Sequence, residues 1–335
     1  MNILYLDCAM GAAGDMLAAA LLELVPDPDE VVAQLNLLGI PGVDFAWERT
    51  TKCGMKGVHF SVKIHGVEEG DEEESAAPRN DLEDVKSIVQ MLHLPTEVEK
   101  NVLGVYGLLA DAESAAHGVP VSQIHFHEVG NLDAIGDIVA VCMLIHRLEP
   151  DEILASPVHV GCGEVKCAHG ILPVPAPATV NLLQGVPTYG GSVKGELCTP
   201  TGAALLKYFV RKYCNQPVMQ VQRVGYGMGK KDFERPNCLR AMLGTTEDTD
   251  TILELSCNVD DMTAEDIGFA QDLLLESGAM DVYTIPLGMK KNRPGTMICV
   301  LCHEEDRKKM VHLLFRHTTT LGVRESLCRR YVMSR

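Results

Sequence analysis

The sequence predicts an α/β (α+β) protein of two domains, and two observations support this prediction. Apolar strand patterns alternate with helical patterns over residues 1–245, which is typical of a mixed α/β domain. Residues 251–335 then show the order strand, helix, strand, strand, helix, strand. The polar stretch from Gly244 to Asp250 is expected to link the two domains.

The first domain begins with a short apolar strand, Asn2–Leu6, that ends at Asp7. A turn rich in small residues, which contains Gly11 and Asp15, leads into the helical pattern of residues 16–24. Backbone N–H groups at such a turn can meet an anion or a cofactor, although the turn matches neither a Walker loop nor GxGxxG. Small residues also let a helix pack closely on a strand, so both interpretations stay open.

The strongest candidate for a metal site is the stretch HFHEVGNLDAIGD. His125 and His127 are two residues apart, so in an extended segment both imidazoles point to the same side. Glu128 follows at once, and Asp133 and Asp137 share one face at the start of a helical pattern. Two imidazoles and three carboxylates suit a first-row metal ion with mixed nitrogen and oxygen ligands.

A structural explanation of the same residues also exists. Asp133 near a helix N-terminus is favourable through the helix dipole alone, and two histidines that alternate with Phe126 fit a half-buried edge strand. His169 is a further candidate ligand, because it precedes residues 171–179, ILPVPAPAT, whose prolines stiffen the backbone and are expected to prevent regular structure. That segment equally fits a rigid edge around the core.

Thr199 and Thr201 stand at the start of another helical pattern, with Pro200 near its first position. Threonine at this place is most often only a helix cap, but a hydroxyl there can also contact a substrate. The complete set of substrate candidates in the first domain is Asp7, Gly11, Asp15, Thr199 and Thr201.

Composition and charge exclude several classes of protein. The net charge of −17 argues against nonspecific nucleic-acid binding, so any anionic ligand must be held by a local basic patch. No apolar run approaches the length of a membrane span, and no signal peptide precedes Leu6. The 12 cysteines follow no regular framework, which favours free thiols in a reducing compartment. We therefore expect a cytoplasmic protein. Residues 68–80 are acidic and nearly free of apolar side chains, so we expect them to form a solvated spacer loop.

The order of strands and helices is clearer in the second domain than in the first. Its expected strands are Ile252–Cys257, Val282–Met289, Met297–Cys302 and Leu321–Val332, and its expected helices are Ala264–Ser277 and Glu304–His317. This β-α-β-β-α-β order is ferredoxin-like. The first two strands then run parallel, so the end of the first, the hairpin after the second and the start of the fourth lie at one edge.

Polar residues fall in all three segments that meet at this edge. Carboxylates can hold a divalent cation, while Lys, Arg and Thr side chains can hold phosphate oxygens. The pattern predicts a metal–nucleotide site, although each loop could also be polar merely because it is solvated. The residues concerned are Asp260, Asp261, Lys290, Lys291, Arg293, Thr318, Thr319, Thr320 and Arg324.

A series of long motifs resembles the LarC family of nickel-insertion enzymes. The motifs occur in the family's order, from Tyr5 to Arg324, and so cover almost the whole chain. They are YLDCAMGAAGDM, HFHEVG, HGILPVPAPAT, TPTGAALL, VGYGMG, NVDDM, MKKNRPGT and TTTLGVR.

The resemblance implies a CTP-dependent nickel chelatase, or cyclometallase, of the lyase class. Such an enzyme inserts nickel into pyridinium-3,5-bisthiocarboxylic acid mononucleotide, which gives the nickel-pincer cofactor of lactate racemase and its relatives, with CMP and pyrophosphate leaving. It also implies that the second domain binds CTP with Mg²⁺ or Mn²⁺, that the first handles nickel and substrate, and that a lactate racemase-type enzyme accepts the product. We further expect a homo-oligomer.

The sequence differs from the LarC family in two places, and three other functions also fit its motifs. Some members carry a histidine-rich tract in place of residues 68–80, and members continue past TTTLGVR, so we expect a further segment beyond Arg335. The rivals are a nonenzymatic nickel chaperone without a nucleotide, a metal-dependent phosphate-ester hydrolase that uses HFHEVG with Asp137, and a purely structural adaptor.

Overall fold

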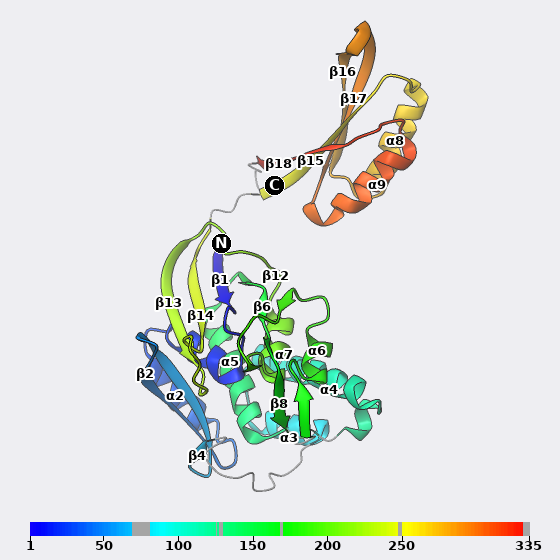
Figure 1. The fold of residues 1–335 in the computed structure, drawn as a ribbon. Helices are drawn as coiled ribbons and strands as arrows, with labels where there is room; N and C mark the ends of the chain where they lie inside the picture. The colour runs from blue at the N-terminus through cyan, green and yellow to red at the C-terminus, as the bar shows by residue number, and fades with distance from the viewer. Residues whose placement is uncertain (69–80, 125, 127–129, 168–169, 247–249, 331–335) are drawn as a thin grey trace. The chain divides into compact units, whose positions relative to one another are not determined.

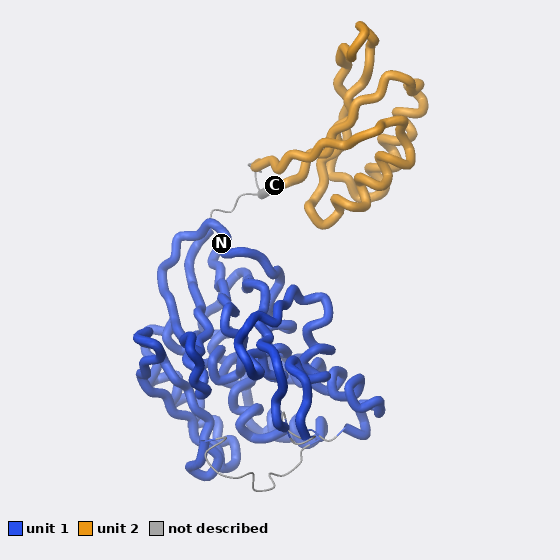
Figure 2. Tube along the Cα trace, in the orientation of Figure 1, with its two compact units in different colours: residues 1–246 blue, residues 247–335 orange. Residues whose placement is uncertain are grey.

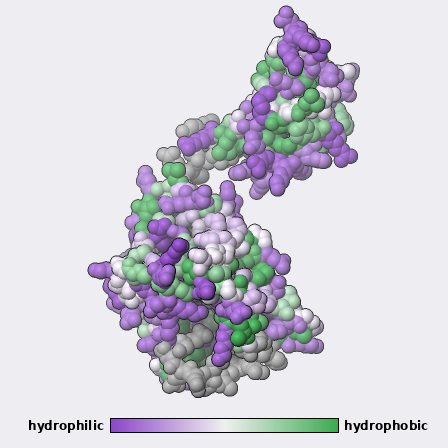
Figure 3. Space-filling model, viewed as in Figure 1, coloured by the Kyte–Doolittle hydropathy of each residue, from purple (hydrophilic) through white to green (hydrophobic). Residues whose placement is uncertain are grey.

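The computed structural model describes residues 1–68, 81–124, 126, 130–167, 170–246 and 250–330. The chain forms two compact units, residues 1–246 and residues 247–335 (Figure 2). No helix among the described residues is long and apolar enough to cross a membrane. On the face that Figure 3 shows, hydrophilic residues cover much of each unit, as the net charge of −17 leads one to expect.

The main sheet of unit 1 is mixed, with the order β12-β5-β1-β14-β13-β3-β2 and with β4 paired to β3 (Figure 1). β1 is parallel to β5 and antiparallel to β14. The first and the last strand of unit 1 in the sequence are therefore neighbours in the middle of the sheet. The strands are β1 (Asn2–Asp7), β2 (Val43–Lys52), β3 (Met55–Ile64), β4 (Val67–Glu68), β5 (Glu152–Ala155), β12 (Lys212–Tyr213), β13 (Gln220–Met228) and β14 (Cys238–Thr245).

Helix α1 is buried on nearly every side because its sequence is almost wholly Ala, Leu and Met. It packs on β13 and β3 and against α5, and α4 in turn contacts α5, α6 and α7. The helices are α1 (Gly14–Leu22), α2 (Pro28–Leu37), α3 (Leu82–Met91), α4 (Thr96–His117), α5 (Leu132–Leu148), α6 (Pro177–Leu182) and α7 (Pro200–Phe209), with a 3₁₀ turn at Val121–Gln123.

Three small strand pairs lie beside this core. They are β6 (Val158–His159) with β10 (Thr188–Tyr189), β7 (Gly161–Cys162) with β11 (Gly195–Glu196), and β8 (Glu164–Cys167) with β9 (Gly170–Pro173). The expectation that prolines keep residues 171–179 irregular is therefore wrong at both ends. Pro173 ends β9, and Pro177 begins α6, where its fixed φ angle suits the first helical turn.

The predicted limits of two connecting segments also need correction. Glu68 belongs to β4 and accepts a hydrogen bond from His59 Nε2 at 3.0 Å, so the spacer loop does not include it; residues 69–80 lie outside the described part. Gly244 lies in β14 and Asp250 begins β15, so the link between the units is shorter than residues 244–250. Pairing with β1 extends β14, and pairing with β18 extends β15.

Unit 2 has the predicted β-α-β-β-α-β order. Its antiparallel sheet runs β16-β17-β15-β18, with α8 and α9 packed on one face through Leu274, Met310 and Leu314. The elements are β15 (Asp250–Val259), α8 (Ala264–Glu276), β16 (Asp281–Met289), a 3₁₀ turn (Lys290–Asn292), β17 (Arg293–Cys302), a 3₁₀ turn (Glu304–Asp306), α9 (Arg307–His317) and β18 (Arg324–Arg330).

The strand directions of unit 2 bring three loops to one edge of the sheet. β15 and β16 are both antiparallel to β17 and therefore run in the same direction. β18 runs opposite to β15, with Arg324 paired to Ser256 near the end of β15. The end of β15, the turn after β16 and the start of β18 consequently lie together.

Candidate substrate and nucleotide sites

The N-terminal halves of α5 and α7 lie close to the start of α1 in unit 1. A Cβ atom at Gly14 would lie 2.5 Å from Asp137 Oδ2 of α5, and one at Gly202 would lie 2.1 Å from the Ala12 carbonyl oxygen. Both positions therefore exclude a side chain. The turn that follows β1 is thus enclosed by three helices, which brings Asp15, Asp137 and Thr199 into one region.

Hydrogen bonds fix this turn to the chain that precedes α7. Gly11 has a φ angle of +83°, and Ala12 N donates to the Leu197 carbonyl oxygen at 3.0 Å. Thr199 N in turn donates to the Ala12 carbonyl oxygen at 3.0 Å. Thr199 Oγ1 accepts from Gly202 N at 3.2 Å, so Thr199 caps α7, while Thr201 lies half-buried in its first turn.

Asp133 and Asp137 act electrostatically on a buried tyrosine of α4. Burial raises the pKa of Tyr106 well above its ordinary value, and the charges of Asp133 and Asp137 raise it further. Asp15 Oδ1 accepts a hydrogen bond from Met16 N at 2.7 Å at the start of α1. Asp15 and Asp133 lie in the first turns of α1 and α5, where the helix dipole favours negative charge, whereas Asp137 lies in the second turn of α5.

The other predicted metal ligands, His125, His127, Glu128 and His169, lie outside the described residues. Within the part of the chain that the structure describes, no group of three or more His, Cys, Asp or Glu side chains could hold a metal ion. The described portion of the predicted metal site is therefore the pair Asp133 and Asp137 on α5.

Asp7 occupies the end of β1 and is held from two sides. Its Oδ2 accepts from Arg240 Nη2 of β14 at 2.6 Å, and its Oδ1 accepts from Ala9 N at 3.2 Å. The Asp7–Arg240 ion pair is partly exposed to solvent. Asp7 therefore anchors the turn after β1 to the centre of the sheet.

A histidine and a tyrosine beside this turn escaped the sequence analysis. His159 is 2% exposed, and its Nδ1 and Nε2 atoms lie 2.9 Å from the carbonyl oxygens of Ala9 and Gly190 respectively. Its ring stacks on Tyr189, with centroids 4.6 Å apart and planes 9° apart. The stack follows from the pairing of β6 with β10, which no local sequence pattern indicates.

Unit 2 gathers many of the residues predicted to bind a nucleotide. Arg293 Nη1 lies 3.3 Å from Asp260 Oδ2, and Thr319 Oγ1 donates a hydrogen bond to Asp261 Oδ1. Arg324 Nη2 donates to Asn258 Oδ1 at 2.9 Å. Carboxylates from the end of β15 are thus in contact with side chains from the other two segments.

The remaining predicted residues differ in their accessibility. Lys290 and Lys291 are exposed in the turn between β16 and β17, where Lys291 has a φ angle of +63°. Thr318 Oγ1 donates to the Leu314 carbonyl oxygen at 2.7 Å, and Thr320 Oγ1 donates to that of Gly322 at 3.0 Å. Within the Thr318–Thr320 turn, Thr319 is therefore the residue whose hydroxyl meets a carboxylate of the site.

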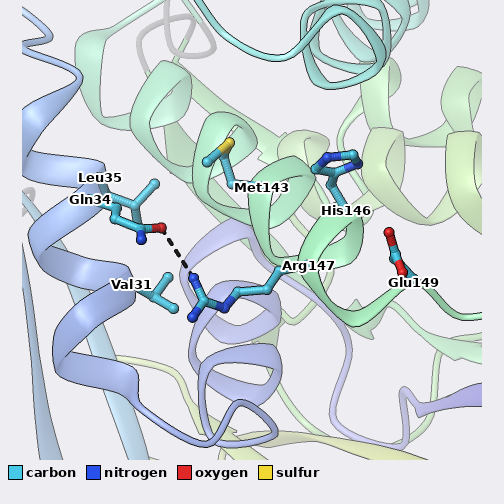
Figure 4. Close-up of a pocket in the computed structure, with 7 residues that line it drawn as sticks. All are labelled: Val31, Gln34, Leu35, Met143, His146, Arg147 and Glu149. Atoms are coloured by element: carbon cyan, nitrogen blue, oxygen red, sulfur yellow. Dashed lines mark hydrogen bonds between the residues drawn. The ribbon is translucent and has the colours of Figure 1, made fainter.

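A pocket of about 340 Å³ lies elsewhere in unit 1, between α2 and the end of α5 (Figure 4). Arg147 points across it and donates to Gln34 Oε1 at 3.1 Å and to Glu30 Oε2 at 2.8 Å. His146 is 13 residues beyond Asp133, which is about 20 Å along a helix. The pocket is therefore remote from the helix starts that carry the candidate carboxylates.

Comparison with known proteins identifies the family. The family model described as nickel insertion protein matches residues 4–335. The chain belongs to the nickel insertion protein family. This confirms the resemblance that the motifs indicated.

Two relatives match this member of the nickel insertion protein family over its full length. Both are named pyridinium-3,5-bisthiocarboxylic acid mononucleotide nickel insertion protein. The one from Clostridium kluyveri is 38% identical over 342 residues, which covers 100% of this chain and 86% of the relative. The one from Geobacillus kaustophilus is 36% identical over 351 residues, which covers 100% of this chain and 85% of the relative.

A solved structure is also similar in sequence. It is described as LarC2, the C-terminal domain of a cyclometallase involved in the synthesis of the NPN cofactor of lactate racemase, in its apo form. The match is 38% identical, covers 26% of this chain and 60% of that chain, and has a TM-score of 0.25.

Proposed function

We propose that this chain inserts nickel into pyridinium-3,5-bisthiocarboxylic acid mononucleotide and consumes CTP in doing so. The observation that carries the proposal is its similarity, over the whole chain, to relatives named for this insertion. Nickel and the mononucleotide are then the substrates, and a nickel-pincer nucleotide is the product. A lactate racemase-type enzyme is the acceptor we propose for this product, and the cytoplasm is the compartment in which we propose that the chain acts.

The nucleotide half of the reaction is assigned to the edge of unit 2. Asp260 and Asp261 would hold Mg²⁺ or Mn²⁺, since hard divalent cations prefer oxygen ligands. The bound ion would offset the charge of the CTP phosphates. Lys290, Lys291 and Arg324 add positive charge at the same edge, which supports phosphate binding in a chain with a net charge of −17.

The nickel half of the reaction is assigned to unit 1. Imidazole and carboxylate groups bind nickel adequately, yet sulfur donors of the product can take it over, which is what a transfer step requires. The proposed ligands are His125, His127, Glu128, Asp133, Asp137 and His169. Asp15, Thr199 and Thr201 are proposed to contact the organic substrate, because they lie at the starts of α1 and α7, and Gly14 of α1 packs against Asp137.

The nucleotide assignment is tested first by isothermal titration of the full chain with CTP. We expect CTP to bind in the presence of Mg²⁺, ATP to bind more weakly, and EDTA to abolish CTP binding. Lys291→Ala should weaken CTP binding about 10-fold, since one charge-assisted phosphate contact is lost. Lys308→Ala is the matched control, because Lys308 is an exposed lysine of α9 outside the three converging segments.

The insertion itself is tested by mixing the chain with nickel, the mononucleotide and CTP. We expect nickel to appear in the organic product and CMP to be released. If nickel and mononucleotide bind but CTP neither binds nor is cleaved, the chain is a nickel carrier and not an enzyme. Hydrolysis of a phosphate ester without nickel or CTP would contradict the proposal in favour of a hydrolase.

A further inference from the structure

We infer that Tyr189 is the platform on which the pyridinium ring of the mononucleotide stacks. This inference rests on the proposed function and adds to it the place where the organic substrate binds. It concerns residues of unit 1 that lie outside the predicted nickel ligands and outside the nucleotide edge of unit 2.

The side chain of His159 fixes the position of the Tyr189 ring. His159 covers one face of the Tyr189 ring, with the ring centroids 4.6 Å apart. His159 cannot easily turn away, because it is 2% exposed and both of its ring nitrogens lie 2.9 Å from backbone carbonyl oxygens. One of these carbonyls belongs to Ala9, which also lies 3.5 Å from the Tyr189 hydroxyl oxygen. The ring is therefore pre-positioned before any ligand arrives.

The tyrosine also remains open to a ligand. Tyr189 is 43% exposed although its ring is packed against a buried histidine, so part of the residue remains open to solvent. The face of an aromatic ring carries partial negative charge and attracts a flat cation. Pyridinium, which the names of the relatives specify, is a flat aromatic cation. Stacking of the two rings matches the flat shape and the positive charge of the pyridinium ring itself.

The position in the fold supports a ligand site as well. Asp7 ends β1 and Ala155 ends β5, and these two strands are parallel neighbours. β6 follows β5 after two residues and places His159 beside Tyr189. In α/β sheets, ligands bind outside the carboxyl ends of parallel strands. The platform lies beside that end of the sheet.

The test compares Tyr189→Leu with Tyr189→Phe in the full chain. The Leu variant removes the aromatic face, while the Phe variant keeps it and removes only the hydroxyl. Isothermal titration with the nickel-free mononucleotide should show affinity about 2- to 30-fold weaker in Tyr189→Leu and within about 2-fold of wild type in Tyr189→Phe. The affinity for CTP should stay unchanged in both variants.

The outcomes separate this inference from the proposed function. If wild type binds the mononucleotide and Tyr189→Leu binds it equally well, the platform is overturned while the insertion function stands. If wild type does not bind the mononucleotide at all, the proposed function is overturned and the platform falls with it. Loss of binding in Tyr189→Phe as severe as in Tyr189→Leu would show that the hydroxyl, not ring stacking, matters.

Discussion

Asp7 Oδ2 accepts a hydrogen bond from Arg240 Nη2 at 2.6 Å, although 233 residues separate the two along the chain. The two residues are direct partners in the pairing of β1 with β14. The strand that opens unit 1 and the strand that leads toward unit 2 are therefore neighbours. The turn after β1, which carries the candidate substrate residues, depends on this late pairing for its position.

The first prediction concerns this ion pair. Asp7→Asn should lower the free energy of unfolding of unit 1 by about 1 kcal/mol, because it removes a charge-assisted hydrogen bond that is partly screened by solvent. Urea unfolding followed by circular dichroism measures the change. Asp232→Asn is the control. It breaks an ion pair with Lys52 in which the Asp232 side chain is 88% exposed, so the free energy of unfolding should change by less than about 0.5 kcal/mol.

The second prediction uses two helical glycines with opposite surroundings. A Cβ atom at Gly202 would lie 2.1 Å from the Ala12 carbonyl oxygen, whereas one at Gly107 of α4 would have nothing within 4 Å. Gly202→Ala should destabilise unit 1 by about 1–3 kcal/mol, and Gly107→Ala should stabilise it by up to about 1 kcal/mol. Thermal melts of both variants test this. Equal effects would contradict the close packing of α7 against the turn that precedes α1.

The third prediction concerns the edge of unit 2. Arg324→Met should weaken Mg–CTP binding about 10-fold and reduce its dependence on salt concentration, because one cation of the phosphate site is removed. Arg307→Met is the matched control, since Arg307 lies at the start of α9 and contacts Glu325 at 3.5 Å. Titration calorimetry at two ionic strengths measures both. Equal losses in the two variants would indicate a nonspecific charge effect.

The fourth prediction follows from a buried thiol. Burial raises the pKa of Cys198 to about 12 from an ordinary value of 9.0, and the charge of Glu196 contributes to the increase. The folded state therefore favours the neutral thiol. The stability that this thiol contributes is fully present below pH 9 and is lost as the pH rises from 9 towards 12, by about 1.4 kcal/mol per pH unit.

Urea unfolding between pH 7.5 and 10.5 tests the thiol prediction. Above pH 9 the free energy of unfolding of wild type should fall more steeply than that of Cys198→Ala. The difference in stability between the two proteins should therefore shrink as the pH increases. Cys53→Ala is the control for the change from cysteine to alanine, because Cys53 is exposed. Parallel curves for wild type and Cys198→Ala would contradict the prediction.

Local patterns predicted most of the secondary structure of unit 2 and the location of its polar edge. The apolar alternation of each strand and the length of each helical pattern define six elements in order. The topology that this order adopts then brings Asp260, Arg293 and Arg324 to one edge without any further information. The ends of elements were less accurate: β18 begins at Arg324 and not at Leu321, because the hydroxyl of Thr320 folds the preceding residues into a turn.

The sequence by itself therefore determined the family, the order of elements and the segments that carry charge, because these depend on neighbours along the chain. The tertiary structure decided the pairing of Asp7 with Arg240, the stacking of His159 on Tyr189 and the close approach of α5 and α7 to the start of α1. Each of these contacts joins residues from separate strands or helices. Strand pairing and helix packing create them, and no local periodicity encodes which strands pair or how closely two helices approach.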